Sequence, residues 1–487
     1  MPPLPVTLLL LAAPARAAEP IGVEAGVALF RARHPAEACV VLLPAAAEEA
    51  DPAARSRARY YLARSLNELG LPISAERELA VLAGLGSEDP YFLHALPGLL
   101  DIARQTGDES TLRAVAPRYA LVDLPPAVAA EVRLQQGLAA WRAGDLRQAL
   151  DLLEGVPEGT PAFARAAYMR GLSQEDSREK TAVKAYRDAA LAAGQDAGGR
   201  ELATLATLRI SAIYEGIGRL DEAEGYAGLV AHDSALWPDA LTVLGRCALS
   251  RGDPLTALDR LQAATSPFLR TDLLVLEADL LRAQALAAVC RRDEAQAGLA
   301  GLGERIGPME AELATFLSQH RDPSGGWRDP AGAWATYFEG FPEDSALDRA
   351  LFVEVLRADP DLVGALRRLA LLKREHAALE DPPPAWRVEL VTDLSAGLES
   401  DRSATRARAG ALLLEGLDAQ RAAMAALAPR IEAAAATLDT PCTPQETTSV
   451  TSDAWNSPWQ PTAPAAAWPF TGEIWADELD PWVGEGR

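Results

Sequence analysis

The chain of 487 residues has few of the side chains on which enzyme active sites depend. Its five histidines lie far apart, and its four cysteines form no CxxC pair, so no metal-ligand spacing is present. The tripeptide His320-Arg321-Asp322 matches a kinase catalytic sequence, but no phosphate loop, strand lysine or DFG accompanies it. The sequence therefore predicts no catalytic, cofactor or metal site, and we expect a protein that is not an enzyme.

The few cysteines are scattered over the chain, at Cys39, Cys247, Cys290 and Cys442. An oxidising compartment would permit a disulfide, but the pairing does not follow from the spacing. We expect the first three to be small, buried apolar residues.

Long apolar runs and an excess of positive charge are also missing. No segment reaches about 18 uninterrupted apolar residues, so we expect no insertion into a membrane. The formal net charge of −23 disfavours nucleic acid and anionic lipid surfaces as partners, because both are negatively charged. The acidity is typical of a chain that stays soluble.

The first 17 residues are typical of a secretory signal peptide, although no lysine or arginine precedes the apolar stretch. Residues 5–13 are largely apolar but too few to span a bilayer, and Ala15-Arg16-Ala17 offers a small-x-small cleavage pattern. We therefore expect export, and a soluble periplasmic protein that is either free or associated with an outer-membrane complex.

Residues that favour sheets are sparse, since alanine and leucine dominate and aromatics make up only 6% of the chain. This composition favours stacked helices, and small residues recur with an internal period of 34 residues. Gly137 is followed 34 residues later by Gly171, and Gly218 by Gly252. The positions that carry the pattern are Gly137, Gly144, Ala149, Gly171, Gly218, Ala223, Gly245, Gly252 and Ala257.

Each type of small residue has a physical role in a helical hairpin. Gly137, with Ala149, lets two helices approach closely, and Gly144 can end the first helix with a positive φ. The aspartates that follow the turn can cap the second helix, and these are Asp145, Asp221 and Asp253. One hairpin cannot bury its own apolar face, so the units are expected to stack.

This pattern resembles the tetratricopeptide repeat (TPR) family over about residues 21–307, which would correspond to about eight hairpins. The resemblance implies an all-α solenoid whose first helices line a concave groove for a protein or peptide partner. In this chain the candidate groove positions are Arg57, Tyr60, Arg64, Asn67, Glu131, Leu134, Leu138, Trp141, Arg165, Tyr168, Leu172, Glu175 and Arg246. Further positions of the same kind are Leu208, Ala212, Glu215, Asp239, Thr242 and Leu249.

The whole chain is expected to contain five segments. These are a signal peptide (1–17), the TPR-like array (18–307), a linker region with a short helix (308–344), a long-helix segment (345–440) and a low-complexity tail (441–487). In the long-helix segment, apolar residues recur at a spacing of three or four from Leu417 to Leu438. This stripe suits either a helix that folds back on its neighbour or a short coiled coil for self-association.

The tail holds five of the ten tryptophans of the chain. So many large aromatics indicate either that the tail docks back onto the solenoid or that it is a recognition strip for a partner. The candidate docking residues are Trp468, Phe470, Trp475 and Trp482. Residues 472–479 are similar to the ends of envelope repeat proteins from gliding myxobacteria-like bacteria.

The sequence thus predicts an exported, non-enzymatic TPR scaffold for protein–protein interactions in a bacterial envelope complex that serves motility, secretion or wall assembly. Two alternatives stay open: the non-catalytic helical part of a cell-wall-processing enzyme system, and a structural, self-assembling protein.

Overall fold

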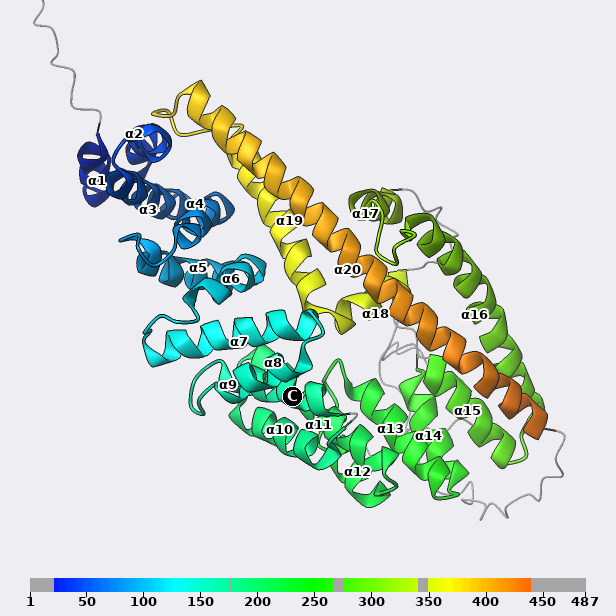
Figure 1. Ribbon diagram of the computed structural model, residues 1–487. Coiled ribbons are helices and arrows are strands. Elements are labelled where there is room, and N and C mark those ends of the chain that lie inside the picture. Colours follow the sequence, from blue (N-terminus) through cyan, green and yellow to red (C-terminus); the bar gives the residue numbers. More distant parts are fainter. Residues whose placement is uncertain (1–21, 176, 267–275, 340–348, 439–487) are drawn as a thin grey trace, which may run out of the picture. The chain divides into compact units, whose positions relative to one another are not determined.

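The computed structural model describes residues 22–175, 177–266, 276–339 and 349–438, most of which are helical. Figure 1 traces the helices in chain order. Residues 23–320 form eight consecutive helical hairpins, and the described residues contain no β-strand beyond an isolated bridge between Arg321 and Trp327. The predicted all-α, solenoid-type fold class is therefore confirmed.

The chain divides into two compact units, and each combines repeat hairpins with part of the C-terminal helical region. Unit 1 comprises the described residues up to 122 together with 364–405. Its N-terminal helices are α1 (Val23–Arg31), α2 (Pro35–Glu48), α3 (Pro52–Glu68), α4 (Pro72–Leu85), α5 (Phe92–Thr106), α6 (Ser110–Val115) and the short helix η1 (Ala116–Tyr119). Most of α19 (Pro360–Ala378) and the first part of α20 (Val388–Thr437) complete it.

Unit 2 comprises residues 123–363 and the described residues from 406 onward. Its hairpins are built from α7 (Pro126–Arg142), α8 (Leu146–Glu154), α9 (Phe163–Gln174), α10 (Glu179–Ala192), α11 (Ala197–Gly216), α12 (Leu220–Ala227), α13 (Trp237–Ser250), α14 (Pro254–Ala264), α15 (Leu276–Ala288) and α16 (Arg292–His320). Helices α17 (Pro330–Glu339) and α18 (Arg349–Ala358) follow. Within each unit every hairpin helix packs against the next one along the chain.

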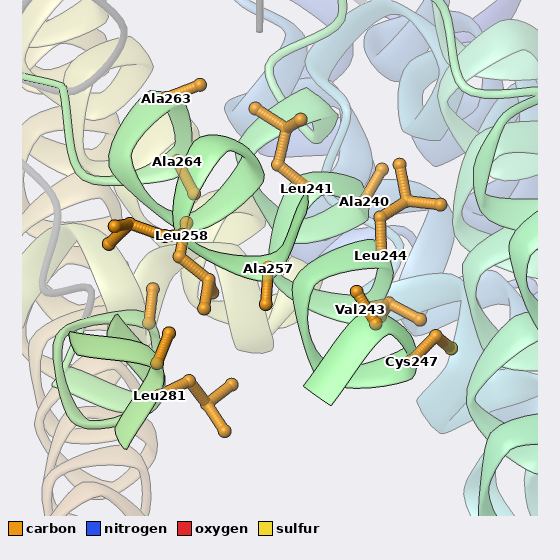
Figure 2. Packing of buried hydrophobic residues seen from close by; sticks show 14 of the residues in the cluster. Ala240, Leu241, Val243, Leu244, Cys247, Ala257, Leu258, Ala263, Ala264 and Leu281 are labelled. Atoms are coloured by element: carbon orange, nitrogen blue, oxygen red, sulfur yellow. The ribbon is translucent and has the colours of Figure 1, made fainter. Parts of the chain in front are cut away.

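The core of each hairpin consists of small and aliphatic side chains. Figure 2 shows one such core in unit 2, to which α13 contributes Ala240, Leu244 and Cys247 and α14 contributes Ala257 and Leu258. Alanine leaves room for the helix axes to come close, and leucine then fills the space between them. This explains why the composition is dominated by these two residues.

The glycines of the repeat lie where the two helices of a hairpin cross. A Cβ atom at Gly245 would lie 2.5 Å from Cγ of Leu261, and one at Gly137 would lie 2.7 Å from Cγ of Leu153. A leucine sixteen residues on thus fills the space beside each glycine, and the backbone oxygen of Ala149 would lie 3.6 Å from a Cβ atom at Gly137. Ala149 is nevertheless fully buried. At Gly171 the ring of Tyr186 fills the corresponding space.

The turn between the helices of a hairpin also follows the prediction. Gly144 and Gly252 have φ angles of +79° and +74°, a conformation that glycine adopts without steric cost. Asp145 and Asp253 then cap α8 and α14 by accepting hydrogen bonds from the backbone N–H groups of Gln148 and Thr256. The expectation for Asp221 is wrong: it lies within the first turn of α12, and its carboxylate pairs with Arg251.

This difference between two aspartates gives a direct test of the capping assignment. Replacing Asp145 with alanine should lower the free energy of unfolding by about 1 kcal/mol, because an amide of α8 loses its acceptor. Asp221→Ala is the matched control, and it should change stability by less than about 0.5 kcal/mol because its side chain is 93% exposed. Urea titrations followed by circular dichroism measure both. Equal losses in the two variants would contradict the assignment.

The apolar stripe of α20 lies buried within the chain. Leu417, Met424, Leu427 and Ala434 are all buried, and Leu438 packs against the hydrophobic cluster of α12–α16. Of the two interpretations of this stripe, packing in cis is the one that the structure shows. The apolar residues of this stripe therefore pack within the chain and do not form an exposed apolar surface.

Candidate binding face

Helix α3 is basic within an acidic protein, since it carries four arginines and a single acidic residue, Glu68. Three of the arginines have polar partners: Arg57 pairs with Glu24, Arg59 pairs with Glu78, and Arg55 donates to the carbonyl of Glu49. The polar partner of Arg64 is neither a carboxylate nor a backbone carbonyl. Arg64 donates to the hydroxyl of Tyr60 at 3.2 Å, and no ion pair joins it to a carboxylate of the described residues.

Arg64 lies beside aromatic rings of α1 and α3 in unit 1, and further rings lie against that of Tyr60. Its guanidinium carbon is 5.4 Å from the ring centroid of Phe30 and 5.9 Å from that of Tyr60. The ring of Tyr60 lies 5.3 Å from those of Tyr61 and Tyr91 and 5.8 Å from His94. We call these six residues, Phe30, Tyr60, Tyr61, Arg64, Tyr91 and His94, the aromatic–arginine patch.

The patch is accessible, because Arg64 and His94 are exposed and its four other rings are only partly buried. Partial burial of Tyr91 raises the pKa of its hydroxyl, so this ring stays neutral at physiological pH. Partly exposed rings beside a cation without a carboxylate partner can bind an aromatic or acidic side chain. Of the predicted groove residues, Tyr60 and Arg64 belong to this patch. Arg57 and Asn67 lie on the same helix, α3, and Arg57 pairs with Glu24 of α1.

In unit 2 the charged residues at the corresponding repeat positions form ion pairs between the first helices of successive hairpins. Glu131 of α7 pairs with Arg165 of α9 at 3.9 Å, and Glu175 lies 3.7 Å from Arg209 of α11. Arg246 of α13 then lies 2.7 Å from Glu215 and 2.8 Å from Glu277. We call this series the ion-pair ladder. It satisfies the charged groove residues of unit 2 within the chain.

The apolar groove candidates of unit 2 take part in packing. Leu134 is fully buried, and Leu138 and Trp141 pack against the same cluster of α7–α9. Tyr168 and Leu172 pack against the cluster of α9–α11, and the ring of Tyr168 lies 5.4 Å from that of Tyr186. Leu208 and Leu249 pack against the cluster that Figure 2 shows, the hydroxyl of Thr242 bonds to its own helix, and Ala212 is exposed.

Residues of the C-terminal helices contact the hairpins of unit 2 as well. Arg357 of α18 pairs with Asp239 at 2.7 Å, and Arg430 of α20 pairs with Glu277 at 3.1 Å. The groove candidate Asp239 and the ion-pair ladder residue Glu277 thus each form an ion pair within the chain.

Unit 1 contains a buried polar network that the sequence did not predict. Arg368 of α19 pairs with Glu76 of α4 and lies 3.5 Å from Asp108, and the side chains of all three are less than a tenth exposed. Two turns further along α19, Glu375 accepts hydrogen bonds from the N–H groups of Ile73 and Ser74 at 2.5 and 3.1 Å. Glu375 therefore caps α4 from about 300 residues away in the sequence.

Burial dominates the electrostatics of this network. Desolvation raises the pKa values of Glu76, Glu375 and Asp401, and Arg368 opposes the shift in each case. The spacing of these residues in the sequence gives no sign of the network, because its members are brought together only when α19 and α20 pack against α4.

The described residues hold no group of three or more histidine, cysteine or carboxylate side chains that could bind a metal ion. Cys39 and Cys247 are buried free thiols, as expected, and burial raises their pKa values to about 12 and about 11. Neither is a reactive thiolate at neutral pH. The expectation for Cys290 is wrong, since this residue is disulfide-bonded. Cys290 takes the place of a turn glycine, with a φ of +67°.

These features define an α-helical repeat protein with TPR-like hairpins and an aromatic, basic face on its first helices. No family model matches the chain, and no curated protein matches it. Among solved structures, the TPR domain of P58(IPK) is similar over 78% of this chain and 96% of that chain, with 13% sequence identity and a TM-score of 0.19. Values this low carry no argument about arrangement or function, so the class rests on the hairpins themselves.

Among the described helices, none is long and apolar enough to span a membrane. The candidate docking residues of the tail, Trp468, Phe470, Trp475 and Trp482, lie outside the described residues, as does the predicted signal peptide.

Proposed function

We propose that this chain is an exported, non-enzymatic scaffold whose repeat hairpins bind a protein partner in a bacterial envelope complex. Motility, secretion and wall assembly are the processes that such a complex would serve. The aromatic–arginine patch is the observation that carries the proposal. It combines partly exposed rings with a cation that has no carboxylate partner among the described residues, a combination that is common at protein interfaces.

The contrast between the two units supports placing the partner at unit 1. The ion-pair ladder already satisfies the charged groove positions of unit 2, so a partner there would have to break existing pairs. At the patch a partner would add contacts to Arg64 and to partly exposed rings without breaking an ion pair. Binding at the patch therefore carries the smaller desolvation cost.

Two observations support export. The first 17 residues are typical of a signal peptide, and Cys290 is disulfide-bonded. Disulfides persist in oxidising compartments such as the periplasm and are rare in the bacterial cytoplasm.

Affinity capture from an envelope fraction tests the proposed partner binding. We expect Tyr60→Ala and Arg64→Glu each to reduce recovery of a specific partner at least tenfold, because residues at the centre of an interface carry most of its binding energy. Arg104→Glu makes the same change of charge on α5, where Arg104 is exposed and paired with Asp101, and it should leave recovery unchanged. Recovery that is equal in all three variants would contradict binding at the patch. Recovery of no specific partner by the unaltered protein would count against a scaffold.

A further inference from the structure

Two carboxylates lie without an ion pair to any described residue where residues 364–405, the C-terminal segment of unit 1, pack on α4. Glu375 of α19 is 2% exposed, and its hydrogen-bond donors, two N–H groups and the hydroxyl of Ser74, are all uncharged. Oδ2 of Asp401 of α20 is shielded from solvent and accepts no hydrogen bond from a described residue. An ionised carboxylate in such surroundings is costly, and binding a proton removes this cost.

The two arginines nearest to these carboxylates bind other groups. Arg368 of α19 pairs with Glu76 and lies 3.5 Å from Asp108. Arg77 of α4 lies 3.9 Å from Glu78, and its guanidinium fills the space beside α20 that a side chain at position 397 would occupy. Both arginines act on Asp401 only through longer-range attraction.

The other charged side chains around this contact pair with one another or face solvent. Arg59 of α3 binds Glu78 at 2.7 Å, and Arg113 of α6 lies 3.7 Å from Glu109. Arg402 of α20 forms an ion pair within its own helix. None of these pairs includes the two carboxylates. The exposed charged or titratable groups of α19 in this segment are Arg367, Lys373, Arg374 and His376.

The direction in which pH acts on this contact follows from burial. Desolvation raises the pKa values of Glu76, Glu375 and Asp401 above their ordinary values, which are 4.5 for glutamate and 3.8 for aspartate. The folded-state pKa then lies above the unfolded-state pKa, so the protonated carboxyl contributes to stability. This contribution is complete below the ordinary values and is lost as the pH rises through the folded-state values.

Protonation is also compatible with the hydrogen bonds of the contact. Oε1 of Glu375 accepts the N–H group of Ile73, and Oε2 accepts the N–H and hydroxyl groups of Ser74. A proton on Oε2 leaves Oε1 as an acceptor, and a serine hydroxyl can accept that proton. The cap on α4 therefore persists when Glu375 is neutral.

We propose that packing of the C-terminal segment on α4 is coupled to proton uptake by Glu375 and Asp401, so that acid tightens this contact and a rise in pH loosens it. The coupling lies wholly within unit 1 and goes beyond the proposed function, because it depends on no partner. Carboxylates that are stabilised in their charged form by an ion pair act in the opposite direction, since acid removes that charge. Tightening on acidification is therefore a distinctive signature.

Hydrogen–deuterium exchange of the full-length protein, measured by mass spectrometry, tests the proposal. We expect protection factors of peptides from residues 72–82 and 364–378, corrected for the intrinsic effect of pH, to rise about tenfold or more from about pH 8 to about pH 5. A tenfold rise corresponds to one coupled proton over one unit of pH. The hairpin α7–α8, whose carboxylates are all at least partly exposed, should change by less than about twofold.

Neutral variants of the two carboxylates sharpen this test. Glu375→Gln combined with Asp401→Asn keeps the shape of both side chains and removes their titration, so the rise in protection should fall below about threefold. Glu389→Gln is the matched control, because Glu389 is an exposed carboxylate of α20 in the same segment, and it should keep the full response.

The unaltered protein gives a decisive result even where the double variant does not fold. Protection of residues 72–82 and 364–378 that stays constant or falls on acidification would overturn the proposal. An equal rise in α7–α8 would also overturn it, because the effect would then be global. A full response in the folded Glu375→Gln, Asp401→Asn protein would show that the proton binds elsewhere.

Discussion

Replacing Arg368 with methionine should lower the free energy of unfolding by about 3–5 kcal/mol, the range typical of an ion pair broken inside a protein. The methionine keeps the apolar stem of the side chain but removes the guanidinium. Glu76 and Asp108, whose side chains are 2% and 4% exposed, then lie buried without their cation. Urea titration followed by circular dichroism measures the loss.

Arg367→Met is the matched control, because Arg367 is the neighbouring arginine on α19 and is exposed. It should change stability by less than about 0.5 kcal/mol. Adding Glu76→Gln to Arg368→Met should recover part of the loss, since one buried charge is then removed together with its partner. An Arg368→Met protein as stable as the control would show that the network does not hold α19 to α4.

The effect of Arg368→Met should also depend on pH in a defined direction. Burial already holds the pKa of Glu76 above its ordinary value of 4.5, and Arg368 opposes that shift. Without Arg368 the folded-state pKa rises further. The folded-state pKa of Glu76 then lies above its unfolded-state pKa, so the protonated carboxyl contributes to stability. This contribution is complete below the unfolded-state pKa and is lost as the pH rises through the folded-state pKa. The variant should therefore recover stability relative to the unaltered protein as the solution is acidified from pH 7 toward pH 5.

Replacing Leu261 with alanine should cost about 2–5 kcal/mol, because this fully buried side chain fills the space above Gly245 where α13 and α14 cross. Gly245→Ala alone should destabilise as well. The alanine methyl group would lie 2.5 Å from Cγ of Leu261. The steric cost of this contact outweighs the gain in helix propensity, which is up to about 1 kcal/mol.

The two substitutions should be strongly coupled, which makes the pair a sharper test than either alone. In the Leu261→Ala protein the methyl group of Gly245→Ala enters vacated space, so the second change should be neutral or stabilising. A thermodynamic cycle of the four proteins, measured by urea titration, gives the coupling free energy. Additive effects would show that Gly245 and Leu261 do not share the crossing point.

The binding face could be predicted only in part. Tyr60 and Arg64 follow from the repeat position of α3, but Phe30, Tyr61, Tyr91 and His94 do not. Phe30 belongs to the first hairpin and Tyr91 and His94 to the third, where the 34-residue pattern is weak. In unit 2 the candidate positions were assigned to a groove, yet residues such as Arg246 lie between carboxylates of neighbouring helices.

The sequence by itself determined the hairpins. Helix length, the crossing glycines, the positive φ at Gly144 and Gly252 and the cap at Asp145 depend on residues within about one repeat of each other, so a short period reveals them. Only the tertiary structure decided where the C-terminal helices pack. Arg368 and Glu76 are 292 positions apart, and buried charges carry no periodic signal that would mark them as partners. The tertiary structure also decided which charged side chains are satisfied in cis, and hence that Arg64 stays available for a ligand.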